Sequence, residues 1–150
     1  MTDTPTPQGA RVTDLVLDVF RLNGLLLAEG DRLGADIGLT SARWQILGAL
    51  DDGPRTVPQI ARAMGLTRQG AQRTVNVLAA EGLVDQRDNP DHKRAKLVAL
   101  TAEGRRRLDA ITARQVHWAR DLAAGLDPAD LNAALGVVRA LRAHLERTAP

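Results

Sequence analysis

The sequence of 150 residues contains no cysteine and no tyrosine, and its aromatic side chains are limited to Phe20, Trp44 and Trp118. Without cysteine the chain can form no disulfide, thiolate metal site or thiol-based redox sensor. No apolar run reaches the roughly 18 residues that a membrane span needs. The polar, Pro-rich first residues lack the apolar segment of a signal peptide. We therefore expect a cytoplasmic protein with no membrane partner and a core of Leu, Val, Ile and Ala.

Motifs of enzymes and metal sites are also missing. There is no Gly-rich phosphate loop, no Gly-x-Ser-x-Gly and no histidine pair spaced to share a helix face. His92, His117 and His144 lie far apart in the sequence, which does not favour a metal site. Asp51 and Asp52 precede a Gly-Pro turn, as at a solvated helix end, and do not indicate an acid–base pair. We expect neither an enzyme nor a bound cofactor.

Charge is unevenly distributed, although the net charge is only +2. Residues 55–107 carry eleven Lys and Arg against five acids, whereas residues 1–54 carry four Arg against eight acids. Residues 108–150 carry five charges of each sign. A basic centre between acidic and neutral ends is typical of a protein that presents one face to a polyanion. An unevenly charged surface without such a partner would give the same distribution.

Hydrophobic periodicity predicts a mainly α-helical fold with a small β-hairpin. Residues 1–9 are rich in Pro and Thr and are expected to be disordered. The expected elements are helices over residues 11–35, 40–52, 56–65 and 67–81, strands over 83–87 and 96–100, and helices over 101–124 and from 127 onward.

Local signals place the ends of the two short helices. Thr56 and Gln59 have the spacing of a capping box, and Gly65 terminates the helix that they open. Thr67 is the expected N-cap of the next helix, and Gly82 ends it. The two helices, their tight turn and the basic hairpin together form the order of a helix-turn-helix followed by a wing.

The second helix of this module carries a face suited to DNA. Ala71, Val75 and Leu78 form its apolar stripe and leave a polar face outside, as an ordinary solvated helix also would. Arg and Gln can each make two hydrogen bonds to guanine or adenine edges in the major groove, and free N–H groups at the helix start favour phosphate. A glycine in the first turn would let the helix approach the groove wall. The predicted DNA-binding residues here are Thr67, Arg68, Gln69, Gly70, Gln72, Arg73 and Asn76.

The hairpin supplies a second group of predicted DNA contacts. The Asn-Pro-Asp turn at residues 89–91 projects three long cations, Lys93, Arg94 and Lys96. Cations on a projecting arm favour the phosphate backbone or a narrow minor groove. We therefore predict that these three side chains bind DNA.

Four motifs carry a resemblance to a known family. They are Leu39-Thr-x-x-Arg-Trp-x-Ile-Leu, Ile60-Ala-Arg-Ala-Met-Gly-Leu-Thr-Arg, Leu78-x-x-Glu-Gly-Leu-Val, and Asn89-Pro-Asp-His-Lys-Arg-Ala-Lys-Leu-Val-x-Leu-Thr-x-x-Gly. From Leu39 to Arg105 the chain resembles the MarR family of winged-helix regulators, and the flanking helices extend the resemblance to nearly all residues after Gly9. One position departs from the family's Asp-x-Arg wing pattern, because His92 stands at the place of the acid.

The resemblance implies a homodimer in which the N- and C-terminal helices of two chains interlock. Two winged helices would then bind half-sites of a pseudo-palindrome about one DNA turn apart. The long Leu and Val stripes of the end helices favour the same arrangement, although they could instead pack within one chain. The expected division is a tail at residues 1–9, a dimerisation helix at 10–36, a winged helix-turn-helix lobe at 37–104 and C-terminal dimerisation helices at 105–150.

Many regulators of this family bind small aromatic acids or other amphipathic molecules between the dimer helices and the DNA-binding lobe. By this resemblance, Trp44 would stack on an aromatic ring, Asn23 would orient a polar group and Arg43 would pair with a carboxylate. His117 or Trp118 would line the far wall. A tryptophan on an amphipathic helix is commonly part of the core instead.

The sequence thus predicts a homodimeric, sequence-specific regulator that binds double-stranded DNA, more specifically a repressor that a small-molecule effector releases. Two other functions would use the same features. A sequence-tolerant, nucleoid-type protein would bind all DNA sequences about equally. A winged helix that binds a protein partner would show little dependence on salt.

Overall fold

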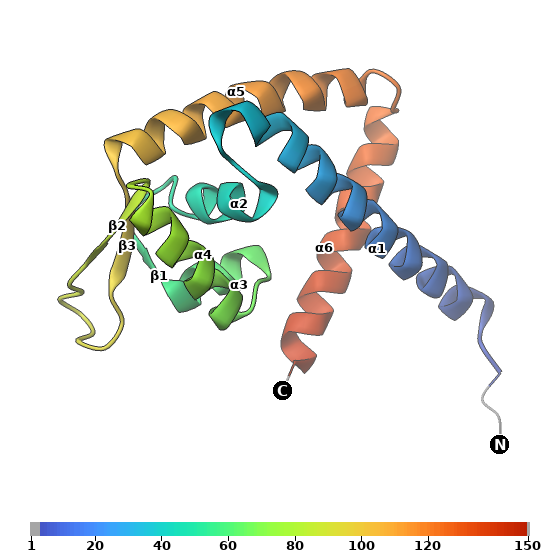
Figure 1. Cartoon of the computed structure of the whole chain (residues 1–150). Coiled ribbons are helices and arrows are strands. Elements are labelled where there is room, and N and C mark those ends of the chain that lie inside the picture. The colour runs from blue at the N-terminus through green and yellow to red at the C-terminus, as the bar shows by residue number, and fades with distance from the viewer. Residues whose placement is uncertain (1–3, 150) are drawn as a thin grey trace. The chain divides into compact units, whose positions relative to one another are not determined.

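A computed structural model defines the fold over residues 4–149 (Figure 1). The chain divides after Thr112 into two compact units, and helix α5 contributes to both. The elements are α1 (Pro7–Gly34), η1 (Ala35–Ile37), α2 (Ser41–Ala49), β1 (Arg55–Thr56), α3 (Val57–Met64), α4 (Arg68–Ala80), β2 (Val84–Arg87), β3 (Leu97–Leu100), α5 (Ala102–Ala123) and α6 (Pro128–Thr148). The predicted mainly helical fold with a small β-hairpin is confirmed. None of the described helices is long and apolar enough to cross a membrane.

Helix α1 begins inside the segment that we expected to be disordered. Thr6 is its N-cap, because the Thr6 hydroxyl accepts a hydrogen bond from the N–H of Gly9 at 3.0 Å. Pro7 opens the helix, where a missing N–H costs nothing. The prediction of a disordered tail over residues 1–9 is therefore wrong for residues 7–9, and its first three residues lie outside the described residues.

Helices α1 and α2 meet at a tight corner. The Ser41 hydroxyl donates a hydrogen bond to the carbonyl oxygen of Leu27 at 2.6 Å, and the Ser41 N–H donates to the Asp31 carboxylate at 2.7 Å. A Cβ atom on Gly30 would collide with the Ser41 hydroxyl. Ser41 is buried, so glycine at position 30 is what allows its hydroxyl to enter the corner.

The helix-turn-helix forms as its local signals predict. The Gln59 N–H donates to the Thr56 hydroxyl at 3.4 Å, and the Thr56 N–H donates to the Gln59 side-chain oxygen at 2.9 Å, which completes the capping box. Gly65 ends α3 with a φ of +64°, a left-handed conformation that glycine adopts without steric cost. Thr67 then caps α4 by accepting the N–H of Gly70 at 3.0 Å.

The sheet has three antiparallel strands in the order β1-β3-β2, so β3 is central. Strands β2 and β3 pair from Val84 opposite Leu100 to Arg87 opposite Leu97 and form the predicted hairpin. Strand β1 adds two further pairs on the other edge of β3. We did not predict β1, because two residues between a turn and a helix show no alternation that could reveal a strand.

One apolar core holds the helix-turn-helix, the sheet and the start of α5 together. Trp44 is half-buried and packs against this core rather than inside it. The largest fully buried side chains are Leu39, Ile46, Leu47, Leu50, Ile60, Val75, Leu78, Leu83, Val98 and Ile111. All lie between residues 39 and 111, so the predicted DNA-binding lobe packs as a unit with the first turns of α5.

Helix α5 starts against the base of the hairpin. The Thr101 hydroxyl accepts the N–H of Gly104 at 3.1 Å and donates to the carbonyl oxygen of Gly82 at 2.6 Å. A Cβ atom on Gly104 would collide with the carbonyl oxygen of Leu83. This contact fixes the distance between α5 and the first residue before β2.

The end helices expose many apolar side chains in the single chain. On α1, Phe20 is 70% exposed and Leu25 is 68% exposed. In the second unit, Asp127 caps α6 by accepting the N–H of Ala129 at 2.7 Å. The exposed large apolar residues of α6 are Leu131, Leu135, Val137, Val138 and Leu145.

Candidate nucleic-acid interface

Helix α4 presents a polar face outward because its apolar stripe is fully used by the core. Ala71, Val75 and Leu78 are completely buried. The predicted contacts Arg68, Gln69, Arg73 and Asn76 are exposed, and Gln72 is half-buried. The Gln72 amide donates a hydrogen bond to the Asn76 side-chain oxygen at 2.8 Å, which orders two neighbouring side chains of this face.

We predicted that Gly70 lets α4 approach the groove wall, and the structure shows a second, local reason for glycine at this position. A Cβ atom at this position would lie 2.9 Å from the Thr67 hydroxyl, the group that caps α4. A larger residue would therefore disturb the cap and the first turn of the helix. Both Thr67 and Gly70 position the start of α4, where free N–H groups point away from the helix.

The wing turn is built by Asn89. Its side-chain oxygen accepts the N–H of Asp91 at 3.0 Å, and its carbonyl oxygen accepts the N–H of His92 at 3.2 Å. Lys93, Arg94 and Lys96 are all exposed. The acid expected before Arg94 is replaced by His92, and no described residue forms an ion pair with Arg94.

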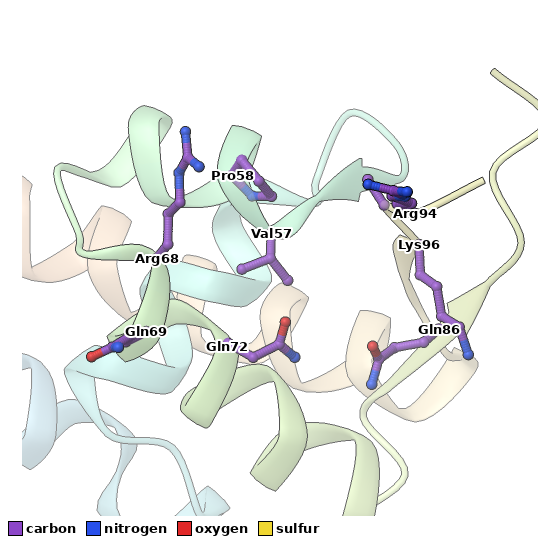
Figure 2. Close-up of a pocket in the computed structure, with 9 residues that line it drawn as sticks. Val57, Pro58, Arg68, Gln69, Gln72, Gln86, Arg94 and Lys96 are labelled. Atoms are coloured by element: carbon purple, nitrogen blue, oxygen red, sulfur yellow. The ribbon is translucent and has the colours of Figure 1, made fainter. Parts of the chain in front are cut away.

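A groove of about 530 Å³ lies between α4 and the wing (Figure 2). It is lined by residues of four segments, namely Val57, Pro58, Arg68, Gln69, Gln72, Gln86, Arg94, Ala95 and Lys96. Figure 2 shows Arg68 beside Pro58 on one side, and Arg94, Lys96 and Gln86 on the other. The structure therefore brings together five predicted contacts from two parts of the sequence.

Other predicted contacts lie outside the groove lining. Thr67 and Gly70 hold the helix start, Arg73 and Asn76 lie further along α4, and Lys93 lies nearer the wing tip. The sequence missed Gln86, Val57 and Pro58 as groove residues. Gln86 is exposed on β2 between a partly buried and an exposed neighbour, and its pairing opposite Val98 of β3 places it in the groove lining.

Unpaired cations are concentrated on this part of the molecule. Asp85 pairs with Arg87 at 2.8 Å, and Glu81 pairs with Arg43 at 2.9 Å, so these two acids are already neutralised. The cations between residues 55 and 96 that form no ion pair with any described residue are Arg55, Arg62, Arg68, Arg73, Lys93, Arg94 and Lys96. Such a surface attracts an anion without first having to break internal ion pairs.

The predicted effector residues separate into three groups. Asn23 and Trp44 line a cavity of about 360 Å³ between α1, α2 and the end of α3. Arg43 does not line it, because its guanidinium binds both carboxylate oxygens of Glu81 and the carbonyl oxygen of Gly38, each at 2.9 Å. His117 and Trp118 lie beyond Thr112, in the second unit. The full lining is Asn23, Leu26, Leu27, Gly30, Ser41, Trp44, Gln45, Gly48 and Met64.

No metal-binding cluster of His, Cys, Asp or Glu occurs among residues 4–149. Two shifted pKa values belong to exposed ion pairs outside the groove. Hydrogen bonds from Arg106 and Arg107 hold the pKa of the Glu103 carboxyl below its usual range. A hydrogen bond to Glu29 raises the pKa of Arg32.

Comparisons with known proteins agree with this geometry. Residues 37–95 match the sequence model of the MarR family. An uncharacterized protein of Mycobacterium tuberculosis is 45% identical over 139 residues, which cover 93% of this chain and 97% of that protein. The HTH-type transcriptional regulator YwoH of Bacillus subtilis is 31% identical over 97 residues, covering 64% of this chain and 70% of YwoH.

Solved structures share the fold over most of the chain. The MarR family transcription regulator SP03579 superposes with a TM-score of 0.79 at 25% identity and covers 95% of both chains. CouR of Rhodococcus jostii, solved with p-coumaroyl-CoA bound, gives a TM-score of 0.76 at 24% identity over 85% of this chain and 91% of CouR. SlyA gives 0.81 at 16% identity over 90% of this chain and 96% of SlyA.

Proposed function

The chain belongs to the MarR family of DNA-binding transcription regulators, and from this premise we propose that it is a sequence-specific homodimeric repressor released from its operator by a small ligand. The observation that carries the proposal is the groove between α4 and the wing. Its polar lining consists of Arg, Lys and Gln side chains, and its cations form no ion pair with a described residue. These groups match the phosphates and base edges of a DNA major groove.

Base reading belongs to α4. Arg73 is a two-pronged donor for guanine, and Gln69, Gln72 and Asn76 carry the amides that bind adenine edges. The wing has a different role, because Lys93, Arg94 and Lys96 lie on a hairpin arm, and cations on such an arm suit phosphates or a narrow minor groove. Specificity would thus come from α4, and affinity for any sequence from the wing.

The test is a fluorescence-anisotropy titration of the protein against its own upstream DNA and a scrambled duplex, at several salt concentrations. We expect tight binding to the upstream DNA that falls steeply with salt, since each phosphate contact releases counterions. A third duplex is the sequence that the protein selects from a random library. Equal affinity for this selected duplex and for the scrambled duplex would contradict sequence specificity. Binding that is insensitive to salt would favour a protein partner instead.

Dimerisation is supported by the exposed apolar side chains of α1 and α6. Phe20 and Leu25 are among the most exposed large apolar residues of the chain, and such surfaces usually mark an interface. Two lobes would then bind half-sites about one turn, or 34–36 Å, apart. We expect Phe20→Asp to yield monomers by sedimentation velocity, whereas Arg21→Asp, at an exposed cation of the same helix, should not. A wild-type protein that sediments as a monomer at micromolar concentration would refute the dimer.

The effector site that we propose is the cavity between α1, α2 and α3. Its walls are apolar, and its polar groups are the amides of Asn23 and Gln45 and the hydroxyl of Ser41. No charged side chain lines it, so a neutral aromatic molecule fits better than the carboxylate that we expected Arg43 to bind. Met64 connects the cavity to the turn before α4. A ligand acts only through its different affinity for DNA-competent and incompetent arrangements.

A panel of aromatic amides and the corresponding carboxylates tests this site. We expect the amides to release DNA at lower concentrations than the carboxylates. Gly48 lines the cavity, and no atom lies within 4 Å of where its Cβ would be, so Gly48→Leu fills the space without a clash at that atom. This variant should bind DNA normally and ignore the amides. Release of the wild type and of Gly48→Leu at the same amide concentrations would exclude the cavity as the site.

A further inference from the structure

A second hollow lies beside α3, outside the groove between α4 and the wing. It has a volume of about 400 Å³ and is lined by Pro54, Arg55, Gln59, Arg62 and Ala63. None of these residues belongs to the predicted DNA contacts. The basic side chains come from β1 and from the exposed face of the first helix of the helix-turn-helix.

The charged side chains that line this hollow are cations only. Arg55 and Arg62 form no ion pair with any described residue. The side-chain oxygen of Gln59 already accepts the N–H of Thr56, so the NH₂ group is the part of this amide that remains available. Asp51, four residues before Arg55 in the sequence, does not line the hollow, and its carboxylate is bound by Arg105. Two guanidinium groups and an amide NH₂ suit an anion, and guanidinium matches phosphate best.

The hollow and the groove have lining residues one helical turn apart on α3. Pro58 lines the groove, and Arg62 follows it by four residues, which places the two side chains one helical turn apart on the same face. Arg68 lies beside Pro58 across the groove edge (Figure 2). A polyanion that passes Arg68 and Pro58 would therefore meet Arg62 next.

We propose that Arg55, Arg62 and Gln59 form a second phosphate-binding surface, which holds the DNA backbone that flanks the segment read by α4. The inference rests on the proposed function, because it needs the groove to hold DNA. Contacts to phosphate position the protein without reading sequence. This surface therefore lengthens the bound DNA and raises affinity for every sequence, while the preferred operator stays the same.

The experiment compares the wild type with R55Q/R62Q and with R11Q/R139Q. The control removes the same charge from two cations that also form no ion pair with a described residue, on α1 and α6. The operator is selected from a random duplex library with the wild type. Each full-length protein is then titrated against that operator and against duplexes whose flanks are shortened stepwise from both ends, at several salt concentrations. Thermal unfolding by circular dichroism checks that all three proteins are folded.

We expect R55Q/R62Q to select the same operator with a weaker salt dependence. At about 0.9 units per phosphate, the four arginines of a dimer would lower the slope of log affinity against log salt by about 3.6 units. Shortening the flanks should weaken binding by the wild type and by R11Q/R139Q but not by R55Q/R62Q. An R55Q/R62Q protein with the salt slope and flank dependence of the control would overturn the inference and leave the regulator intact. A wild type that selects no operator would overturn both.

Discussion

Arg94 in the wing allows a direct measurement of one phosphate contact. Its side chain is exposed and has no ion-pair partner among the described residues, so Arg94→Ala removes no interaction from the free protein. We expect its free energy of unfolding to change by less than about 0.5 kcal/mol, as at most surface positions. Any loss of DNA affinity then reports the contact with DNA itself.

The size of that loss follows from counterion release. One phosphate contact contributes about 0.9 to the slope of log affinity against log salt, so a dimer that lacks Arg94 twice should lose about 1.8 units. Between 50 and 200 mM salt this changes the relative affinity of variant and wild type by about 12-fold. The loss should be the same for operator and scrambled duplexes, because a phosphate contact carries no sequence information.

Arg87 provides the matched control in the same hairpin. It pairs with Asp85 at 2.8 Å in the free protein, so it is already occupied. Arg87→Ala removes the same charge as Arg94→Ala and should leave the salt slope nearly unchanged. Anisotropy titrations of the three proteins at four salt concentrations provide the comparison. Equal slopes for the two variants would refute the reasoning, because the effect would then depend on total charge and not on an unpaired wing cation.

Three further outcomes are expected. Arg73→Ala should cost about 1–3 kcal/mol of binding to the operator and relax the preference at a single base position, as a selection from random duplexes would reveal. Gly104→Ala forces a Cβ atom into the carbonyl oxygen of Leu83 and should lower the free energy of urea unfolding by about 1–3 kcal/mol. Gly48→Ala is the control, because its Cβ meets no atom within 4 Å, and it should raise the same free energy by about 0.5–1 kcal/mol. Hydrogen bonds from its two arginine partners lower the pKa of Glu103, so this carboxylate stabilises the fold above its ordinary pKa of 4.5, and the stabilisation is lost as pH falls through the lowered pKa. In Glu103→Gln, the thermal stability should therefore fall less on acidification than in the wild type.

Helix ends and the helix-turn-helix could be predicted because their signals are local. The capping box of Thr56 and Gln59 involves residues three apart, and the stripe of Ala71, Val75 and Leu78 depends only on helical spacing. The start of α1 was also encoded locally, by a threonine before a proline. We predicted disorder for these residues instead, because their composition is rich in Pro and Thr.

Features that depend on distant residues could not be predicted. Strand β1 exists only because β3, some forty residues later, pairs with it. The role of Arg43 changed for the same reason, since its partner Glu81 lies 38 positions away and no local pattern links them. The groove also depends on distant residues, because its lining comes from segments between residues 57 and 96. Its cations were predicted from two segments, but Gln86 entered the lining only through the register of β2 on β3.

The corner formed by Gly30 and Ser41 gives α1 the mechanics of a lever. From this corner to Pro7 the helix rises by about 35 Å, so a rotation of about 5° at the corner displaces the far end by about 3 Å. Because the buried Ser41 hydroxyl fills the space beside Gly30, the corner is stiff and passes such a displacement on instead of absorbing it. A substitution that loosens this corner would therefore uncouple α1 from α2 without touching the DNA surface, and it would also alter the effector cavity, because Gly30 and Ser41 line that cavity.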